Sequence, residues 1–191
     1  MNVKTVVMGA LEAAQGRDDA IVDRGARHRA RSVRFVECLA AGLLEEHADY
    51  GQAVASMTKH DGQYRHLFGM NELLFDVALV SYDIVDSGNS GKDLAFVTRG
   101  LWIVESEMAK DKRQALFDFN KLILGQADNK LFVGPNVHDD ADYLRVLGRA
   151  ASNCSGSLYV ALIPHPDQWP VSTEDPVGVW AWREHTWEPM S

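Results

Sequence analysis

A strand-helix-strand order in the middle of the chain constrains its fold more than any other feature. The expected strands and helices follow one another over residues 94–108, 110–125, 129–135, 139–152 and 157–163. The second and fourth segments carry apolar residues at helical spacing, whereas the others are apolar runs rich in β-branched and aromatic residues. A buried strand, an amphipathic helix and another buried strand in this order favour a parallel crossover connection within one sheet.

A β-hairpin precedes this crossover. Residues 72–86 predict a strand, and Ser-Gly-Asn-Ser-Gly at 87–91 predicts the turn that leads into the strand at 94–108. A hairpin that pivots near residues 90 and 91 places Asp76 opposite Glu105, and cross-strand partners share one face of a sheet. Because the hairpin is antiparallel and the crossover parallel, we predict an α/β fold with a central mixed β-sheet flanked by helices.

The remaining segments complete one expected domain over residues 1–191, with a core over about 30–165 and a tryptophan-rich extension over about 166–191. Helices are expected over 3–15 and from about residue 23 to 47, and residues 48–70 are read as helical or irregular, with a strand beginning near Tyr64. In the extension, Trp180, Trp182 and Trp187 are expected to pack against the body and to add an edge strand. A surface for stacking nucleic-acid bases is the alternative.

Charge argues in two directions about partners. The net charge of −8 is unlike that of most dedicated nucleic-acid-binding proteins, which neutralise phosphates with an excess of basic residues. Basic residues nevertheless crowd into positions 24–34, at the start of an expected helix, where the helix dipole favours an anion. Candidate partners are therefore nucleic acid, DNA or RNA, and a second copy of the chain. With no transmembrane-length apolar run and no signal peptide, we expect a cytoplasmic protein without a membrane partner.

The strand at 94–108 ends in two carboxylates, Glu105 and Glu107. Residues two apart in a strand point to the same face, so these side chains would project together beside a buried core. Like charges in such a place are unfavourable unless a cation lies between them. The pair therefore predicts a bound metal ion or a basic side chain at this strand end.

A family resemblance rests on three motifs taken in order. They are Asp76, then Glu105-Ser106-Glu107, then Asp118-Phe119-Asn120-Lys121-Leu122. Over roughly residues 30–135 the chain resembles the PD-(D/E)XK, or restriction-endonuclease-like, nuclease superfamily. Phe75 replaces the proline of that motif, and Glu107 stands where the motif has lysine. The chain looks like an uncharacterised branch in which a lysine of the next helix replaces the strand lysine.

This resemblance implies a restriction-endonuclease-like core and a Mg²⁺-dependent or Mn²⁺-dependent nuclease that hydrolyses phosphodiester bonds of DNA or RNA. Asp76 and Glu105 would hold the metal through hard oxygen ligands, with help from Glu107 and Glu37. The metal would lower the pKa of a bound water. Lys121 would position that water or stabilise the transition state.

Other interpretations stay open for each of these residues. The same fold is compatible with a non-catalytic nucleic-acid-binding or protein-binding module in which the acidic site is vestigial. Alternatively, Glu105 and Glu107 form a structural ion network with Arg99, Arg113 or Lys110. Two further assignments have ordinary alternatives. Glu37 suits the solvated flank of its helix, and Asp118 and Lys121 have the spacing of an intrahelical ion pair.

Overall fold

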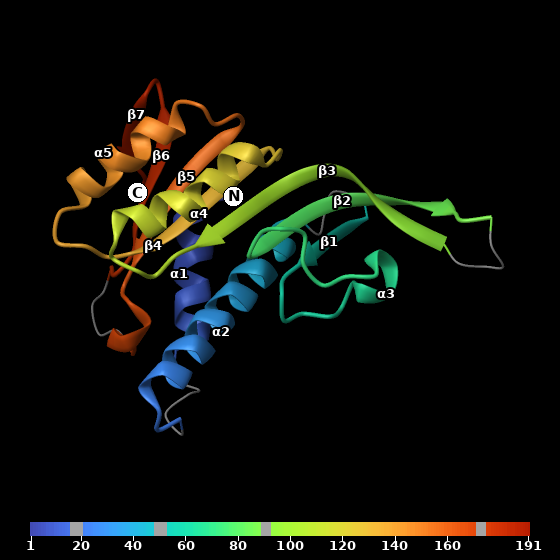
Figure 1. The fold of residues 1–191 in the computed structure, drawn as a ribbon, viewed down its shortest axis with the longest axis horizontal. Coiled ribbons are helices and arrows are strands. Elements are labelled where there is room, and N and C mark those ends of the chain that lie inside the picture. The colour runs from blue at the N-terminus through green and yellow to red at the C-terminus, as the bar shows by residue number, and fades with distance from the viewer. Residues whose placement is uncertain (16–20, 48–52, 89–92, 171–174) are drawn as a thin grey trace.

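One mixed β-sheet organises the protein (Figure 1). The computed structural model describes residues 1–15, 21–47, 53–88, 93–170 and 175–191. Within these residues seven strands lie in the sheet in the same order as in the sequence. They are β1 (Val54–Met57), β2 (Val77–Asp86), β3 (Asp93–Ser106), β4 (Asn129–Pro135), β5 (Ser157–Ile163), β6 (Gly178–Arg183) and β7 (Thr186–Pro189).

Helices flank the sheet, and the predicted mixed α/β architecture is confirmed. The described α-helices are α1 (Val3–Ala14), α2 (Arg24–Glu45), α3 (Arg65–Phe68), α4 (Lys112–Leu124) and α5 (Asp140–Ala151), followed by the 3₁₀ turn η1 (Pro166–Gln168). Strand β3 pairs with β4, and β4 with β5, in parallel, whereas the other neighbours are antiparallel. Helices α4 and α5 are therefore the crossover connections that the sequence predicts.

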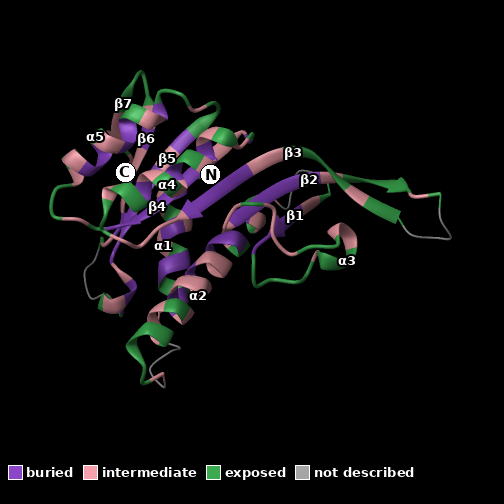
Figure 2. Ribbon diagram, viewed as in Figure 1, coloured by how far each residue is buried: buried purple, intermediate pink, exposed green. Residues whose placement is uncertain are grey.

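The two faces of the sheet have separate hydrophobic cores. Residues of α1 and α2 pack on one face together with Trp102 and Val104 of β3. Residues of α4 and α5 pack on the other face together with Ile103. Because side chains alternate along a strand, the residue after Val104 emerges on the α4 face. Strands β4 and β5 and the end of β3 nearest the helices are mostly buried by this double-sided packing (Figure 2).

The β2–β3 hairpin extends beyond the body as an exposed arm (Figures 1 and 2). Its register at the body end pairs Val77 with Val104, and continued by one residue this register places Asp76 opposite Glu105, as predicted. Regular pairing counted from the same turn would place Asp83 opposite about Thr98, but Asp83 pairs with Phe96. Two irregularities in the pairing leave residues 98 and 101 of β3 without partners in β2 and restore the expected register near the body. Part of the predicted turn at 87–91 lies outside the described residues.

Two boundary predictions are corrected. The strand expected to begin near Tyr64 is the short helix α3, which ends at Gly69 in a left-handed conformation with φ of 73°. Tyr64 and Phe68 pack against the body-proximal part of the hairpin instead. Strand β2 begins only at Val77, since Leu74, with φ of 66°, interrupts an extended backbone upstream.

The C-terminal tail extends the sheet. Strand β6 pairs with β5, so the tail adds a strand to the sheet as expected, but β6 is not the edge strand, because β7 folds back and pairs with it. Trp180, Trp182 and Trp187 are half-buried against the α4–α5 core, so the expected packing is also confirmed. Among the described helices, none combines the length and the apolar character needed to cross a membrane.

Candidate active site

Acidic side chains gather where β3 ends, beside the start of β2 and the flank of α4. Asp76 immediately precedes β2, and Glu105 is the last residue but one of β3. Glu107 follows the strand, and its amide nitrogen still donates to the carbonyl oxygen of Val133 in β4, 2.9 Å away. Asp118 comes from α4. The carboxyl ends of β3, β4 and β5 meet at this edge, a location where α/β proteins commonly bind ligands.

Glu105 is the most buried member of this acidic cluster. Its exposed fraction is 1%, and its Oε2 atom accepts a hydrogen bond from Nζ of Lys121 at 3.0 Å. The same Nζ atom lies 2.8 Å from Oδ1 of Asp118. The predicted intrahelical pair thus exists, and Lys121 also reaches the strand. Oε1 of Glu105 is buried without a hydrogen-bond partner in the described structure. The ammonium group of Lys121 therefore bridges the carboxylates of Glu105 and Asp118, and Oε1 of Glu105 remains a buried acceptor without a donor among the described residues.

Asp76 is held by the residue between the two glutamates. Its Oδ2 atom accepts hydrogen bonds from the amide nitrogen of Ser106 at 2.9 Å and from the Ser106 hydroxyl at 2.6 Å. These bonds tie the start of β2 to the end of β3 and keep the Asp76 carboxylate close to Glu105. This role of Ser106 was not predicted from the sequence, although the position of Ser106 between Glu105 and Glu107 could have indicated it.

Glu107 is oriented by its own loop and faces the helices. Its Oε1 atom accepts a hydrogen bond from the amide nitrogen of Ala109 at 2.7 Å. Burial raises the pKa of Glu107, and a side-chain hydrogen bond with Asp118 together with the charges of Asp118 and Asp76 adds to this effect. Tyr143 of α5 lies near enough that the charge of Glu107, after burial, raises the pKa of its phenol. The Tyr143 hydroxyl is also buried without a hydrogen-bond partner in the described structure.

The cluster contains one carboxyl group with a strongly raised pKa, Glu105, and one lysine that keeps its charge, Lys121. Burial raises the pKa of Glu105 to about 7, and the charges of Asp76 and Asp118 act in the same direction against the opposing effect of Lys121. Burial alone would lower the pKa of Lys121, but its hydrogen bonds to Asp118 and Glu105 raise it overall. Glu105 therefore changes its charge near neutral pH while Lys121 stays protonated.

The remaining predicted metal ligand lies elsewhere in the structure. Glu37 is half-buried on α2, and α2 packs on the sheet face opposite α4. Among the described residues, no hydrogen bond or ion pair joins Glu37 to Asp76, Glu105 or Glu107. The structure thus brings together Asp76, Glu105, Glu107 and Lys121, with Asp118 as an additional member, and leaves Glu37 apart.

The donor chemistry of the cluster suits a hard divalent cation, because every acidic member offers carboxylate oxygens. The free Oε1 atom of Glu105 is a buried acceptor that such an ion could use. In the part of the chain that the structure describes, however, no three His, Cys, Asp or Glu side chains converge closely enough to hold a metal. Local hydrogen bonds fix Asp76 and Glu107 instead. A metal would therefore need one of these carboxylates to turn toward Glu105.

Three of the basic residues in the first part of α2 have partners within the protein. Arg24 forms an ion pair with Asp167 of η1 at 2.6 Å, and Arg31 donates to the carbonyl oxygen of Pro166 at 2.7 Å. The His28 ring lies 4.8 Å from that of His165, centroid to centroid. Asp167, a carboxylate of the protein itself, therefore neutralises one of these arginines. Likewise Arg99, a proposed partner of the strand-end glutamates, pairs with Asp128 at 2.7 Å.

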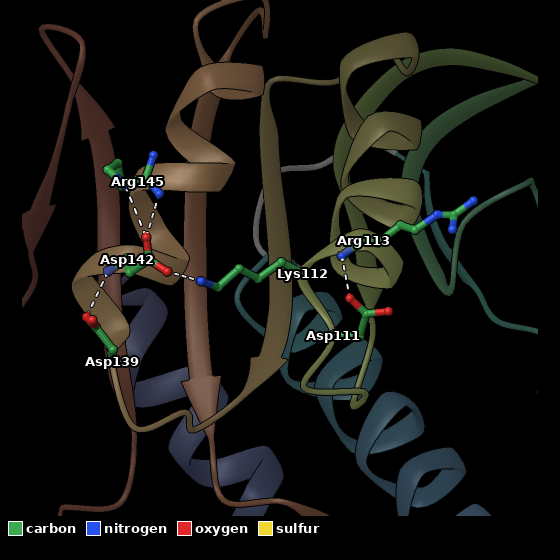
Figure 3. A network of polar contacts seen from close by, with 6 residues as sticks. All are labelled: Asp111, Lys112, Arg113, Asp139, Asp142 and Arg145. Atoms are coloured by element: carbon green, nitrogen blue, oxygen red, sulfur yellow. Dashed lines mark hydrogen bonds and ion pairs between the residues drawn. The ribbon is translucent and has the colours of Figure 1, made fainter.

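A polar network holds the two crossover helices together beside the cluster (Figure 3). Asp142 of α5 accepts hydrogen bonds from Lys112 of α4 and from Arg145, and its amide nitrogen donates to the capping carboxylate of Asp139 at 2.9 Å. Asp139 thus caps the N-terminus of α5. Asp111 caps α4 in the same manner. The contact between Lys112 and Asp142 ties the N-terminal ends of α4 and α5 to each other.

A buried lysine that was not predicted from the sequence stabilises the C-terminal end of α4. Lys130 of β4 is fully buried, and its Nζ atom donates to the carbonyl oxygens of Leu122 and Gly125 at 2.8 Å each and to the Ser155 hydroxyl at 3.3 Å. It thereby satisfies carbonyl groups at the end of α4 that the helix itself leaves unpaired. A lysine inside an otherwise apolar strand was the available signal.

Comparison with known proteins adds no relative. No protein-family model matches the chain, and neither a curated protein nor a solved structure is detectably similar to it.

Proposed function

We propose that the protein is a Mg²⁺-dependent or Mn²⁺-dependent phosphodiesterase that acts on DNA or RNA at the acidic cluster. The observation that carries the proposal is the buried Glu105 carboxylate, which has a free oxygen and three further carboxylates around it. Keeping so much negative charge at a strand end is unfavourable for folding alone. Lys121 neutralises only part of this negative charge, and the remaining charge favours binding of a cation.

With Asp76 or Glu107 turned toward Glu105, these three carboxylates would hold the ion, which would lower the pKa of a bound water molecule and stabilise charge on phosphoryl oxygens. The Ser106 hydroxyl orients Asp76 toward the cluster, and Asp118 orients Lys121. Lys121 is 41% exposed, so its ammonium group reaches solvent from within the cluster. There it would donate a hydrogen bond to a phosphoryl oxygen of the substrate.

The first experiment measures metal binding separately from catalysis. The melting temperature is recorded with and without Mg²⁺ or Mn²⁺ for the wild type, for Glu105→Gln and for Glu12→Gln. Glu12 is an exposed residue of α1 and provides the matched control. A ligand that binds the folded state at 100 times its Kd stabilises it by about 2.7 kcal/mol. We expect the wild type and Glu12→Gln to be stabilised by the ion and Glu105→Gln not to be. Equal shifts in all three proteins, or none, would refute the metal site.

The second experiment measures cleavage of plasmid DNA and of single-stranded DNA and RNA. Lys121→Met is compared with Arg113→Met, which removes an exposed cation from the same helix outside the cluster. We expect Lys121→Met to lose about 100-fold in rate, in line with the loss of a transition-state hydrogen bond, and Arg113→Met to retain activity. Cleavage that persists unchanged in Asp76→Ala would identify a contaminant and end the nuclease proposal.

One observation favours the second candidate, a non-catalytic binding module. Lys121 already bridges Glu105 and Asp118, so part of the negative charge is neutralised without a metal. In that case Mg²⁺ leaves the melting temperature unchanged and Lys121→Met lowers it, because the two carboxylates lose their shared partner.

A further inference from the structure

A pocket of about 740 Å³ lies between α5 and the β6–β7 hairpin. Its walls include Trp180, Trp182 and Trp187 from the hairpin strands, Arg145 and Arg149 from α5, and His185 from the hairpin turn. The volume falls within the range of about 300 to 1,000 Å³ that is typical of small-molecule sites. None of these residues belongs to the acidic cluster.

The aromatic wall follows from the strand register. Trp180 and Trp182 are two residues apart on β6 and share a face, and Trp182 pairs directly with Trp187 of β7. The Trp182 and Trp187 rings lie 4.8 Å apart at an interplanar angle of 59°, so they contact each other at a tilt and not in a parallel stack. The indole nitrogen of Trp187 donates to the carbonyl oxygen of Leu144 at 2.8 Å and holds its ring against α5.

Gly148 permits this close packing of the helix against the hairpin. A Cβ atom at this position would lie 3.2 Å from ring atoms of both Trp182 and Trp187. The indole rings are thus anchored on one side and half-buried. They are rigid aromatic surfaces and not loose surface side chains.

The charged wall of the pocket is mainly basic. Arg145, Arg149 and His185 line it, against one acidic residue, Asp140. The guanidinium group of Arg145 is held by Asp142 through Nε at 3.1 Å and Nη2 at 2.5 Å, as Figure 3 shows. Arg149 is exposed, and among the described residues it forms no ion pair. The pocket therefore pairs a rigid aromatic surface with an available cation, on a protein whose net charge is −8.

The geometry points to this pocket as a binding site for single-stranded nucleic acid, in which a base stacks on the tryptophan surface and Arg149 contacts the neighbouring phosphate. Aromatic stacking accepts every base because each has a π-face, and the cation supplies attraction to the backbone. Arg149 lies two turns along α5 from Asp142, which ties α5 to α4 beside the acidic cluster. The inference rests on the proposed function and specifies its substrate as a single strand.

The test measures binding of a fluorescein-labelled oligothymidylate by fluorescence anisotropy in EDTA, so that cleavage cannot interfere. Arg149→Glu is compared with the wild type and with Arg113→Glu, a matched reversal at an exposed arginine of α4 outside the pocket. We expect Arg149→Glu to weaken binding about tenfold or more and to reduce the slope of log K against log salt by about 0.7, the value for one phosphate contact on a single strand. Arg113→Glu should bind as the wild type does.

Tryptophan emission provides an independent readout of stacking. We expect the oligothymidylate to quench the emission of the wild type, and heparin, a polyanion without bases, not to quench it. Equal affinity of Arg149→Glu and the wild type would overturn the site. Two other outcomes would also overturn the site. One is oligothymidylate binding that causes no quenching and is displaced equally well by heparin, because charge attraction alone would then explain the binding. The other is tighter binding of a duplex of the same sequence than of the single strand.

Failure of this site and failure of the proposed function give different results. Glu12→Gln, at an exposed position outside both the pocket and the acidic cluster, should bind the oligothymidylate as the wild type does. If Mg²⁺ fails to stabilise the wild type while Arg149→Glu still weakens binding, the metal proposal fails and the pocket stands. If Mg²⁺ stabilises the wild type while Arg149→Glu has no effect, the pocket fails and the metal proposal stands.

Discussion

Replacing Glu105 by glutamine should change the pH dependence of stability in a specific direction. The pKa of Glu105 is raised from 4.5 to about 7 in the folded protein, chiefly by burial. Glutamine has nearly the same shape as glutamate, and its side-chain carbonyl can still accept a hydrogen bond from Lys121. It cannot ionise, so it resembles the protonated glutamate at every pH.

The direction follows from proton linkage. Below pH 4.5 the carboxyl is protonated in both the folded and the unfolded protein, and its raised pKa has no effect on stability. Between pH 4.5 and about 7 the unfolded chain ionises first, so the wild type loses stability as pH rises. Above about pH 7 the full loss is present. Glu105→Gln escapes this loss.

The magnitude comes from the same two values. The difference of 7 − 4.5 = 2.5 pKa units corresponds to about 3.5 kcal/mol, at about 1.4 kcal/mol per unit. The free energy of unfolding of Glu105→Gln minus that of the wild type should therefore increase by about 3 kcal/mol between about pH 4 and about pH 8, a window that contains most of this titration.

Urea denaturation at a series of pH values, followed by circular dichroism, measures this difference directly. The substitution does not affect titrating groups far from the cluster, so the contributions of those groups cancel in the subtraction. Glu12→Gln, at an exposed position, should differ from the wild type by no more than about 0.5 kcal/mol at any pH. Parallel curves for Glu105→Gln and the wild type would refute the reasoning, because the Glu105 carboxyl would then titrate alike in the folded and unfolded chains.

Three further substitutions test the packing around the cluster by urea denaturation. Lys130→Met removes the donor of two buried carbonyl groups and should lower the free energy of unfolding by about 3 kcal/mol; a loss below about 1 kcal/mol would contradict the role of Lys130 at the end of α4. Gly100→Ala places a Cβ atom 2.5 Å from the carbonyl oxygen of Gln126 and should lower the free energy of unfolding by about 2 kcal/mol. An unchanged free energy of unfolding would mean that the backbone at Gln126 can move away from the added Cβ atom without cost. Ser106→Ala removes the 2.6 Å hydroxyl bond to Asp76 but keeps the amide bond, so a loss of about 1 kcal/mol is expected, and no loss would show that the hydroxyl bond contributes nothing.

The hairpin shows why a prediction near the body held while one near the tip did not. Counting from the turn placed Asp76 opposite Glu105, and the register at Val77 and Val104 agrees. The same count misplaced Asp83 because it assumed regular pairing throughout. Two unpaired residues in β3 separate the two regions, and such irregularities depend on how the arm twists away from the body. Local patterns carry no signal for them.

The start of β2 and the C-terminal tail show the same difference between features that a local pattern predicts and features that tertiary packing decides. Residues 72–76 have the composition of a strand, yet Leu74 adopts a left-handed conformation because the chain turns there from α3 into the sheet. Conversely, the alternation in 179–183 was sufficient to predict β6, because a strand beside β5 buries one side of that pattern.

The sequence by itself determined the order of the elements, the parallel crossovers and the face on which Glu105 emerges, because these follow from hydrophobic periodicity and chain connectivity. The tertiary structure alone decided which charges meet. Lys121 reaches both Asp118 and Glu105, Arg99 turns to Asp128, and Glu37 stays on the opposite face. Periodicity specifies the direction of a side chain, but the distance between two side chains depends on how far a helix slides along its sheet. That distance is set by the packing of all the residues between them.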